Sequence, residues 1–189
     1  DSVGLHDKRP TFAITLHPAT LSRDNLSMAQ AMLGALDAYP QANLLFTGSN
    51  ADPQAAVLDD LIKAFVCQRT NAVFHTTLGS SRYFSALAHC DLVLGNSSSG
   101  LTEAVSMGTP TVNIGDRQAR RVRPASVIDC APEAGAICAA IEIALEGDWS
   151  GIANPYGDGQ SASCIIKHLA SVEDPAALTR KSFKDLAHD

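Results

Sequence analysis

Short apolar runs alternate with longer amphipathic segments along most of this chain. The runs are continuously apolar, which is typical of strands that are covered on both faces of a parallel sheet. Helices between consecutive strands require parallel crossover connections, so the pattern predicts a doubly wound, Rossmann-like α/β fold. The predicted strands are 11–16, 42–47, 72–75, 91–94, 111–114 and 126–129. The predicted helices are 24–39, 53–68, 80–89, 99–107, 132–145, 160–171 and 175–187.

Length and composition favour one domain. With 189 residues, 46% of them hydrophobic, the chain is long enough for one sizeable core. We therefore expect a single domain over 1–189, with its core in 10–172 and a terminal helical segment in 173–189. A formal net charge of -6 argues against a nucleic-acid partner, which usually meets a basic face.

The sequence also bears on the compartment. No apolar stretch approaches the roughly 20 residues that a membrane span requires, and the first ten residues lack the apolar core of a signal peptide. The 5 cysteines are odd in number and widely spaced, without a CxxC motif, which is typical of free thiols in a reducing environment. We expect a cytoplasmic protein without a membrane partner.

The segment 91–121 carries the strongest functional signal. A run of small residues, GNSSSG at 95–100, follows a predicted strand and precedes a helix, where backbone amides and hydroxyls can surround a phosphate. Ordinary helix capping by serine is the alternative. Glu103 follows Ser99 by one helical turn and can accept hydrogen bonds from both ribose hydroxyls, although a glutamate near a helix start is also favoured by the helix dipole.

Polar residues recur where predicted strands end, and ligands of doubly wound sheets bind beyond the carboxyl ends of the strands. The polar residues after these strands are His17, Asn50, Ser97 and Arg117, and Leu78 follows the predicted strand 72–75. Arg117 is the first residue of a basic stretch that continues through Arg123. This stretch can supply the local positive charge that a nucleotide needs, and the alternative is that it is a solvated loop. Without a GxGxxG motif we expect no dinucleotide and no other cofactor.

Two further kinds of chemistry are disfavoured. His75, His89 and His168 lack partners at metal-ligand spacing, so no metal site is predicted. Ser97 follows a strand and precedes a helix, as a hydrolase nucleophile would, but the GxSxG motif is absent in that register.

Four ordered segments resemble the hydrolysing UDP-N-acetylglucosamine 2-epimerases, in particular the branch that makes sialic-acid precursors. They are TLHPAT at 15–20, FTGSNAD at 46–52, GNSSSG through GDRQ and Arg121 at 95–121, and NPYGDG at 154–159. One departure is the pair Gly48-Ser49, where many members carry Tyr-Pro or a similar pair.

The resemblance implies a function. It identifies the chain as the C-terminal half of a two-domain enzyme of the glycosyltransferase-B type, which releases UDP and N-acetylmannosamine. The implied ligand residues for UDP or a UDP-N-acetylhexosamine are His17, Asn50, Leu78, Ser97, Ser98, Glu103 and Arg117. The proton-transferring acids of the family belong to the N-terminal domain, so no catalytic residue is expected here and the isolated chain should be inactive. The segment 173–189 would cross toward that domain, and the whole protein could be an oligomer.

Two alternatives remain at this point. A glycosyltransferase donor domain shares the architecture and the ribose-binding glutamate, but it usually lacks the pairing of GNSSSG with GDRQ. A nucleotide-binding module that acts without a partner domain is the other alternative.

Overall fold

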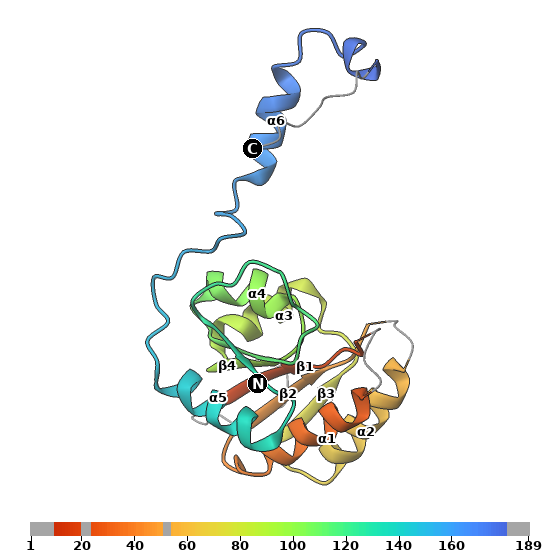
Figure 1. The fold of residues 1–189 in the computed structure, drawn as a ribbon, viewed down its shortest axis with the longest axis vertical. Helices are drawn as coiled ribbons and strands as arrows, with labels where there is room; N and C mark the ends of the chain where they lie inside the picture. The colour runs from red at the N-terminus through yellow and green to blue at the C-terminus, as the bar shows by residue number, and fades with distance from the viewer. Residues whose placement is uncertain (1–9, 20–23, 51–53, 181–189) are drawn as a thin grey trace, which may run out of the picture. The chain divides into compact units, whose positions relative to one another are not determined.

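A computed structural model describes residues 10–19, 24–50 and 54–180. They form a six-stranded parallel sheet in the order β3-β2-β1-β4-β5-β6 (Figure 1). The strands are β1 (Thr11–Thr15), β2 (Asn43–Thr47), β3 (Ala72–His75), β4 (Leu92–Gly95), β5 (Thr111–Ile114) and β6 (Val127–Cys130). Each predicted strand is confirmed to within one residue at either end, and so is the doubly wound, Rossmann-like fold.

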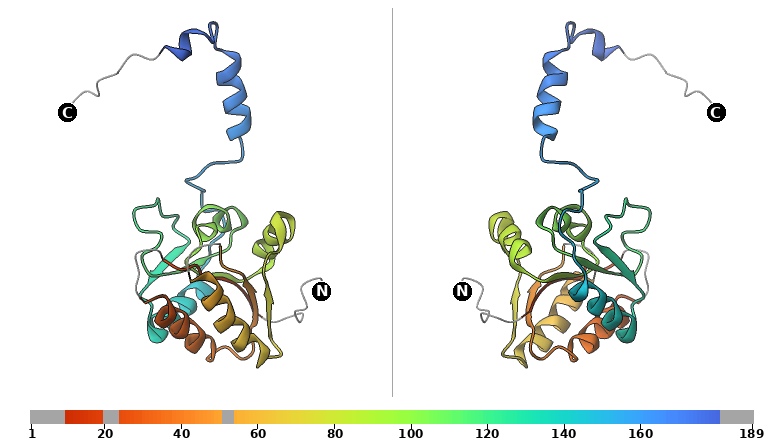
Figure 2. Two further views of the ribbon diagram at one scale, coloured as in Figure 1. Left: turned by 90° about the vertical axis from the view of Figure 1, so that its right-hand side faces the viewer. Right: turned by 90° about the vertical axis from the view of Figure 1, so that its left-hand side faces the viewer.

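Helices cover both faces of the sheet. On one face lie α1 (Asn25–Leu36), α2 (Ala55–Cys67) and α5 (Ala134–Glu146), and on the other lie α3 (Gly79–His89), α4 (Ser99–Thr102) and the 3-10 turn η1 (Ala104–Met107) (Figures 1 and 2). Helix α1 ends three residues before Tyr39, where it was predicted to end, because the following Pro40 disfavours a helical backbone at Tyr39.

The connection between β3 and β4 reverses the direction in which the sheet grows. From β1 the chain adds β2 and β3 on one side, and then returns through α3 to place β4 on the other side of β1. The carboxyl ends of β1 and β4 therefore form the topological switch point, which is where open α/β sheets bind their ligands.

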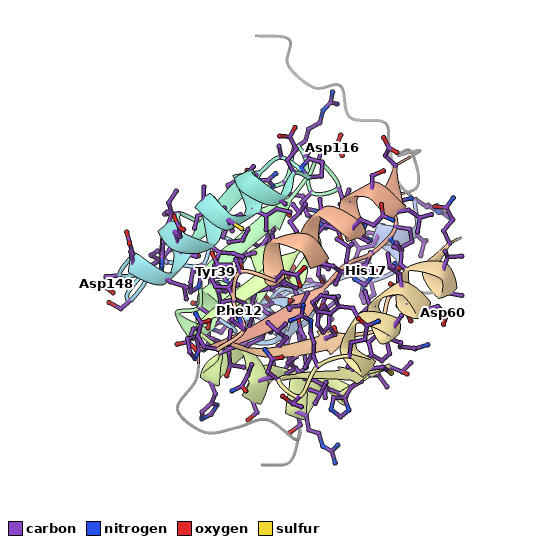
Figure 3. All side chains as sticks on the ribbon, turned by 90° about the horizontal axis from the view of Figure 1, so that it is seen from below. Phe12, His17, Tyr39, Asp60, Asp116 and Asp148 are labelled. Carbon is purple, nitrogen blue, oxygen red and sulfur yellow. The ribbon has the colours of Figure 1, made fainter. Side chains whose placement is uncertain are left out.

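The core explains why the strands are continuously apolar. On β1, Phe12 and Ile14 pack with the helices of the α1 face, whereas the intervening Ala13 packs with Leu87 of α3 on the opposite face. The Phe12 ring meets the Tyr39 ring edge-on at 5.5 Å between centroids (Figure 3). Successive side chains point to opposite faces and both faces are covered, so neither set is polar.

The region between β4 and β5 differs from the prediction. One α-helix was expected over 99–107, but the chain forms the single turn α4 and then tightens into η1, which ends at Gly108 with φ 71°. A 3-10 turn is common where a short helix ends. The predicted end at residue 107 is confirmed. Gly108 follows it with a left-handed backbone, which is strained for other residues.

The contacts divide the chain into two compact units, 1–155 and 156–189. In the second unit, α6 (Ser161–Ala170) has no buried residue, and the last buried apolar residue of the described chain is Ala144. The predicted core of 10–172 thus extends beyond the buried residues. The helix predicted over 175–187 is wrong in its described part, which contains only the 3-10 turn η2 (Ala177–Thr179). Residues 181–189 lie outside the described ranges.

Among the described helices, none combines the length and the apolar character that crossing a membrane would require.

Candidate functional site

The predicted ligand residues fall at the carboxyl edge of the sheet. His17 follows β1 and Ser97 follows β4, so these two residues flank the switch point. Both are partly exposed, whereas Asn96, directly before Ser97, is fully buried. The architecture alone therefore brings together loops that lie far apart in the sequence.

Asn96 connects three of these loops. Its side-chain Oδ1 accepts a hydrogen bond from the His17 backbone N–H at 2.7 Å, and its Nδ2 donates to the His17 carbonyl at 2.8 Å. Its own carbonyl accepts from Arg117 Nη1 at 3.1 Å and from Gln118 Nε2 at 2.8 Å. Its backbone N–H donates to the Thr15 carbonyl at 3.2 Å. One buried residue thus positions three loops. They are the histidine loop, which contains His17 after β1, the serine loop 95–100 and the arginine loop 117–123.

The four arginines of the loop 117–123 have different environments. Arg117 is partly buried and makes no ion pair with any described residue. Arg123 instead pairs with Asp129 at 2.9 Å and also donates to the Gln118 carbonyl. Arg120 and Arg121 are exposed. Arg117 donates to the Asn96 carbonyl next to the serine loop, so it is a cation that an anionic ligand at this loop can use.

The serine loop supplies donors. The backbone N–H groups of Ser97 and Ser98 have no acceptor among the described residues, and the Ser99 N–H makes only a long bond of 3.4 Å to Ser97 Oγ. The two glycines of this loop are required by close packing against neighbouring strands. A Cβ on Gly95 would lie 2.0 Å from the Thr15 carbonyl oxygen, and one on Gly100 would lie 2.4 Å from a Thr111 methyl.

Glu103 lies where α4 meets η1, one turn beyond Ser99. Its Oε2 and the Ser99 Oγ are buried and have no hydrogen-bond partner among the described residues. Tyr83 of α3 lies close to both. Burial raises the pKa of the Tyr83 phenol and the Glu103 carboxylate raises it further, whereas the Ser99 and Thr15 hydroxyls lower it. The phenol is near Ser99 without forming a hydrogen bond of good geometry. This group of polar atoms is incompletely satisfied by the protein.

The remaining two predicted residues differ in their connection to this network. Asn50 donates its backbone N–H to His17 Nδ1 at 3.1 Å, so it joins the network directly. Leu78 lies in the loop between β3 and α3, directly before the helix, and its side chain is buried. Among the described residues, no hydrogen bond joins it to the other predicted ligand residues. Thr20 and Asp52, which belong to the family-like segments, lie outside the described residues.

Sequence reasoning missed Asn96, Gln118 and Tyr83 as members of the site. Asn96 and Gln118 stand next to predicted residues, but a polar side chain in a loop gives no sign of burial. Tyr83 lies on a helix whose pattern is that of an ordinary amphipathic segment. Their roles depend on contacts between segments, which no local pattern encodes.

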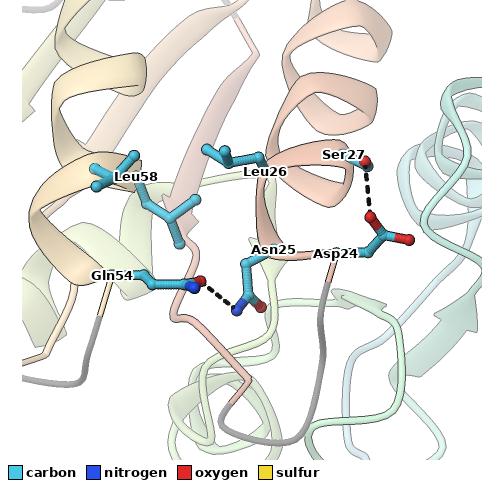
Figure 4. Close-up of a pocket in the computed structure, with 7 residues that line it drawn as sticks. Asp24, Asn25, Leu26, Ser27, Gln54 and Leu58 are labelled. Atoms are coloured by element: carbon cyan, nitrogen blue, oxygen red, sulfur yellow. Dashed lines mark hydrogen bonds between the residues drawn. The ribbon is translucent and has the colours of Figure 1, made fainter.

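A separate hollow lies at the amino-terminal turns of α1 and α2 (Figure 4). It has a volume of about 390 Å³ and is lined by Asp24, Asn25, Leu26, Ser27, Gln54, Val57 and Leu58. The Asn25 amide is already bonded to the Ala19 backbone and to Gln54 Oε1. None of the predicted ligand residues lines this hollow, so we place the candidate site at the Asn96 network. In the described part of the chain no three His, Cys, Asp or Glu side chains gather as a metal site would.

Comparison with known proteins identifies the family of this chain. The profile of the UDP-N-acetylglucosamine 2-epimerase family matches residues 2–170, which is most of the chain. The chain belongs to the UDP-N-acetylglucosamine 2-epimerase family. It is 31% identical over 180 residues to the polysialic acid biosynthesis protein P7 of Escherichia coli, a match that covers 92% of this chain and 45% of that protein.

Other family members extend the comparison. The GDP/UDP-N,N'-diacetylbacillosamine 2-epimerase (hydrolyzing) of Campylobacter jejuni is 36% identical over 121 residues, which cover 62% of this chain and 31% of that protein. The solved UDP-GlcNAc 2-epimerase of Methanocaldococcus jannaschii superposes with a TM-score of 0.68 at 19% identity, over 89% of this chain and 47% of that chain. At that identity the superposition supports the fold alone. The chain spans less than half the length of these relatives.

Proposed function

We propose that this chain is the UDP-binding, C-terminal half of a hydrolysing UDP-N-acetylglucosamine 2-epimerase, which releases UDP and N-acetylmannosamine. The observation that carries the proposal is the convergence of His17 and Arg117 on buried Asn96, which directly precedes Ser97 at the switch point. Family membership supports the choice of a uridine nucleotide over another anion.

The available groups fit the parts of UDP. The N–H groups of Ser97 and Ser98 would donate to phosphate oxygens, and Arg117 would offset their negative charge. His17 lies across the switch point from these donors, where an imidazole N–H can donate to the same diphosphate. Glu103 would accept hydrogen bonds from the ribose hydroxyls. Asn50 would contact the substrate, and backbone groups at Leu78 would meet the uracil edge.

The elimination that releases UDP requires two things. A base must remove the proton at C2 of the sugar, and donors must stabilise the departing diphosphate. The groups above supply the second requirement. We assign the first to the N-terminal domain of the same protein, so this chain alone should bind UDP weakly and catalyse no epimerisation. The preference for N-acetylglucosamine over a diacetylbacillosamine sugar would also depend on that domain.

Isothermal titration of the chain with UDP tests the proposal. Arg117→Ala removes charge-assisted hydrogen bonds of about 1.5–3 kcal/mol, which corresponds to about 10- to 150-fold in Kd. Glu103→Ala should weaken binding to a similar extent, and Ser98→Ala less. Lys63→Ala and Glu142→Ala remove exposed charges elsewhere and serve as matched controls.

Two outcomes would contradict the proposal. One is that the folded chain shows no affinity for UDP at low salt, either alone or within the whole protein. The other is that Arg117→Ala and Glu103→Ala bind UDP as tightly as the two control variants. A whole protein that releases N-acetylmannosamine from UDP-N-acetylglucosamine without a sugar acceptor would exclude the glycosyltransferase alternative.

A further inference from the structure

We infer that Asn96 is a positioning residue, which fixes the place and the tautomer of the His17 imidazole at the UDP site. This inference rests on the proposed function for its effect on ligand binding. Asn96 is 0% exposed, and both ends of its side-chain amide bond to the His17 backbone, while its Nδ2 also donates to Met28 Sδ at 3.8 Å. The two residues are 79 positions apart in the sequence.

The amide pairing resembles a single rung of sheet hydrogen bonding. Oδ1 accepts the His17 N–H and Nδ2 donates to the His17 carbonyl, at 2.7 and 2.8 Å. An asparagine side chain offers one acceptor and two donors, which matches a backbone N–H and C=O together. An aspartate would place a second acceptor oxygen against the His17 carbonyl, so the pairing requires the amide.

The fixed backbone of His17 in turn holds its imidazole where one tautomer is favoured. The His17 Nδ1 accepts a hydrogen bond from the Asn50 backbone N–H at 3.1 Å, so Nδ1 carries a lone pair and a neutral ring holds its proton on Nε2. The same β2–α2 loop is held by Ser49 Oγ, which donates to the Leu16 carbonyl at 2.8 Å. The His17 backbone and the acceptor face of its ring are therefore held from two sides.

Asn96 also links this histidine to the arginine. Its carbonyl accepts hydrogen bonds from Arg117 and Gln118, so a shift of Asn96 would move the histidine loop and the cation together. Gln118 is 1% exposed, which places this second contact in the interior. Loss of the Asn96 side chain should release His17 first, because the carbonyl remains in the backbone.

The first test needs no ligand. In the free chain, long-range ¹H–¹⁵N NMR spectra of the ring should show His17 with Nε2 protonated and Nδ1 bare. Asn96→Ala should give averaged ring nitrogen shifts as both tautomers become populated. Asn71→Ala is the matched control, because Asn71 is also buried and its side-chain amide also bonds to a distant backbone segment. Its Nδ2 donates to the carbonyls of Pro40 and Ala42, which precede β2, whereas Asn71 itself precedes β3.

The second test is a double-mutant cycle on the dissociation constant for UDP. Asn96→Ala should weaken UDP binding about tenfold and Asn71→Ala less than twofold. If Asn96 acts through His17, adding Asn96→Ala to His17→Ala should change the constant less than twofold. Should Asn96→Ala fail to fold, the isosteric Asn96→Asp replaces it in both tests, with the same expected tautomer averaging.

Three outcomes would overturn the inference. The ring nitrogen shifts of Asn96→Ala could equal those of wild type, or its UDP affinity could match that of Asn71→Ala. In the cycle, the fold-changes in the dissociation constant from Asn96→Ala and His17→Ala could also multiply in full. A folded wild-type chain that binds no UDP, either alone or within the whole protein, would refute the proposed function instead, and the NMR result would still decide the role of Asn96.

Discussion

Replacing Gly95 by alanine should cost far more than replacing Gly34 or Gly108. Gly95 has φ 133°, and an added Cβ would lie 2.0 Å from the Thr15 carbonyl oxygen and 2.8 Å from its carbon. Both atoms belong to the backbone of β1, which pairs with Gly95 across the switch point. The methyl group can therefore be accommodated only if β1 and β4 separate.

The magnitude follows from two contributions. The backbone conformation at positive φ costs about 1–3 kcal/mol for a residue other than glycine. Overpacking against a rigid neighbour costs about 1–3 kcal/mol more. We expect Gly95→Ala to lower the free energy of unfolding by about 2–6 kcal/mol. In a domain of this size, each kcal/mol corresponds to about 2–4 °C in Tm.

Two other glycines separate the contributions. Gly108 has φ 71° with nothing within 4 Å of an added Cβ, so Gly108→Ala should cost only the backbone strain, about 1–2 kcal/mol. Gly34 lies in α1 with nothing within 4 Å and an ordinary helical φ, so Gly34→Ala should stabilise by about 0.5–1 kcal/mol.

Urea unfolding followed by circular dichroism measures all three variants. The expected order of stability is Gly34→Ala, wild type, Gly108→Ala and then Gly95→Ala. If Gly95→Ala were as stable as Gly108→Ala, the close approach of β1 and β4 would not be the reason for this glycine, and the geometry assigned to the serine loop would be refuted.

Burial raises the pKa of the Cys90 thiol to about 12, so Cys90 should resist iodoacetamide at pH 8 while exposed Cys164 reacts, as mass spectrometry would show. Because the folded chain keeps this proton after the unfolded chain loses it, the stabilisation is present below about pH 9 and is lost as the pH rises toward 12. The urea midpoint should therefore fall more steeply above pH 9 in wild type than in Cys90→Ala, and equal slopes would contradict this. Asn154→Ala should cost about 1–2 kcal/mol, because the Thr102 carbonyl and the Ser106 hydroxyl lose its Nδ2 donor at 2.8 and 2.7 Å, and a change within 0.3 kcal/mol in urea unfolding would show these bonds to be unimportant.

Local patterns in the sequence were enough to predict the strands and the class of fold. Continuous apolar runs such as Leu92–Leu94 can be satisfied only where both faces are covered, so their pattern predicts a buried parallel strand without any knowledge of its partners. The predicted end of a helical segment at Gly108 was equally local, because it depends on the conformational freedom of one residue. Most of the candidate site residues were also predicted in this way, since they follow strands.

The connections between those residues depend on how the chain folds in three dimensions. Asn96 and His17 are separated by 79 positions, and their pairing depends on β4 returning to lie beside β1. Because β4 lies beside β1, Gly95 is also necessary for packing. The sequence had indicated Gly95 only as part of a phosphate-binding loop. Local patterns report the environment of one segment, whereas burial and hydrogen-bond partners are set by segments that meet after folding. The physical reason is that a buried polar group must find its partner wherever the fold places one.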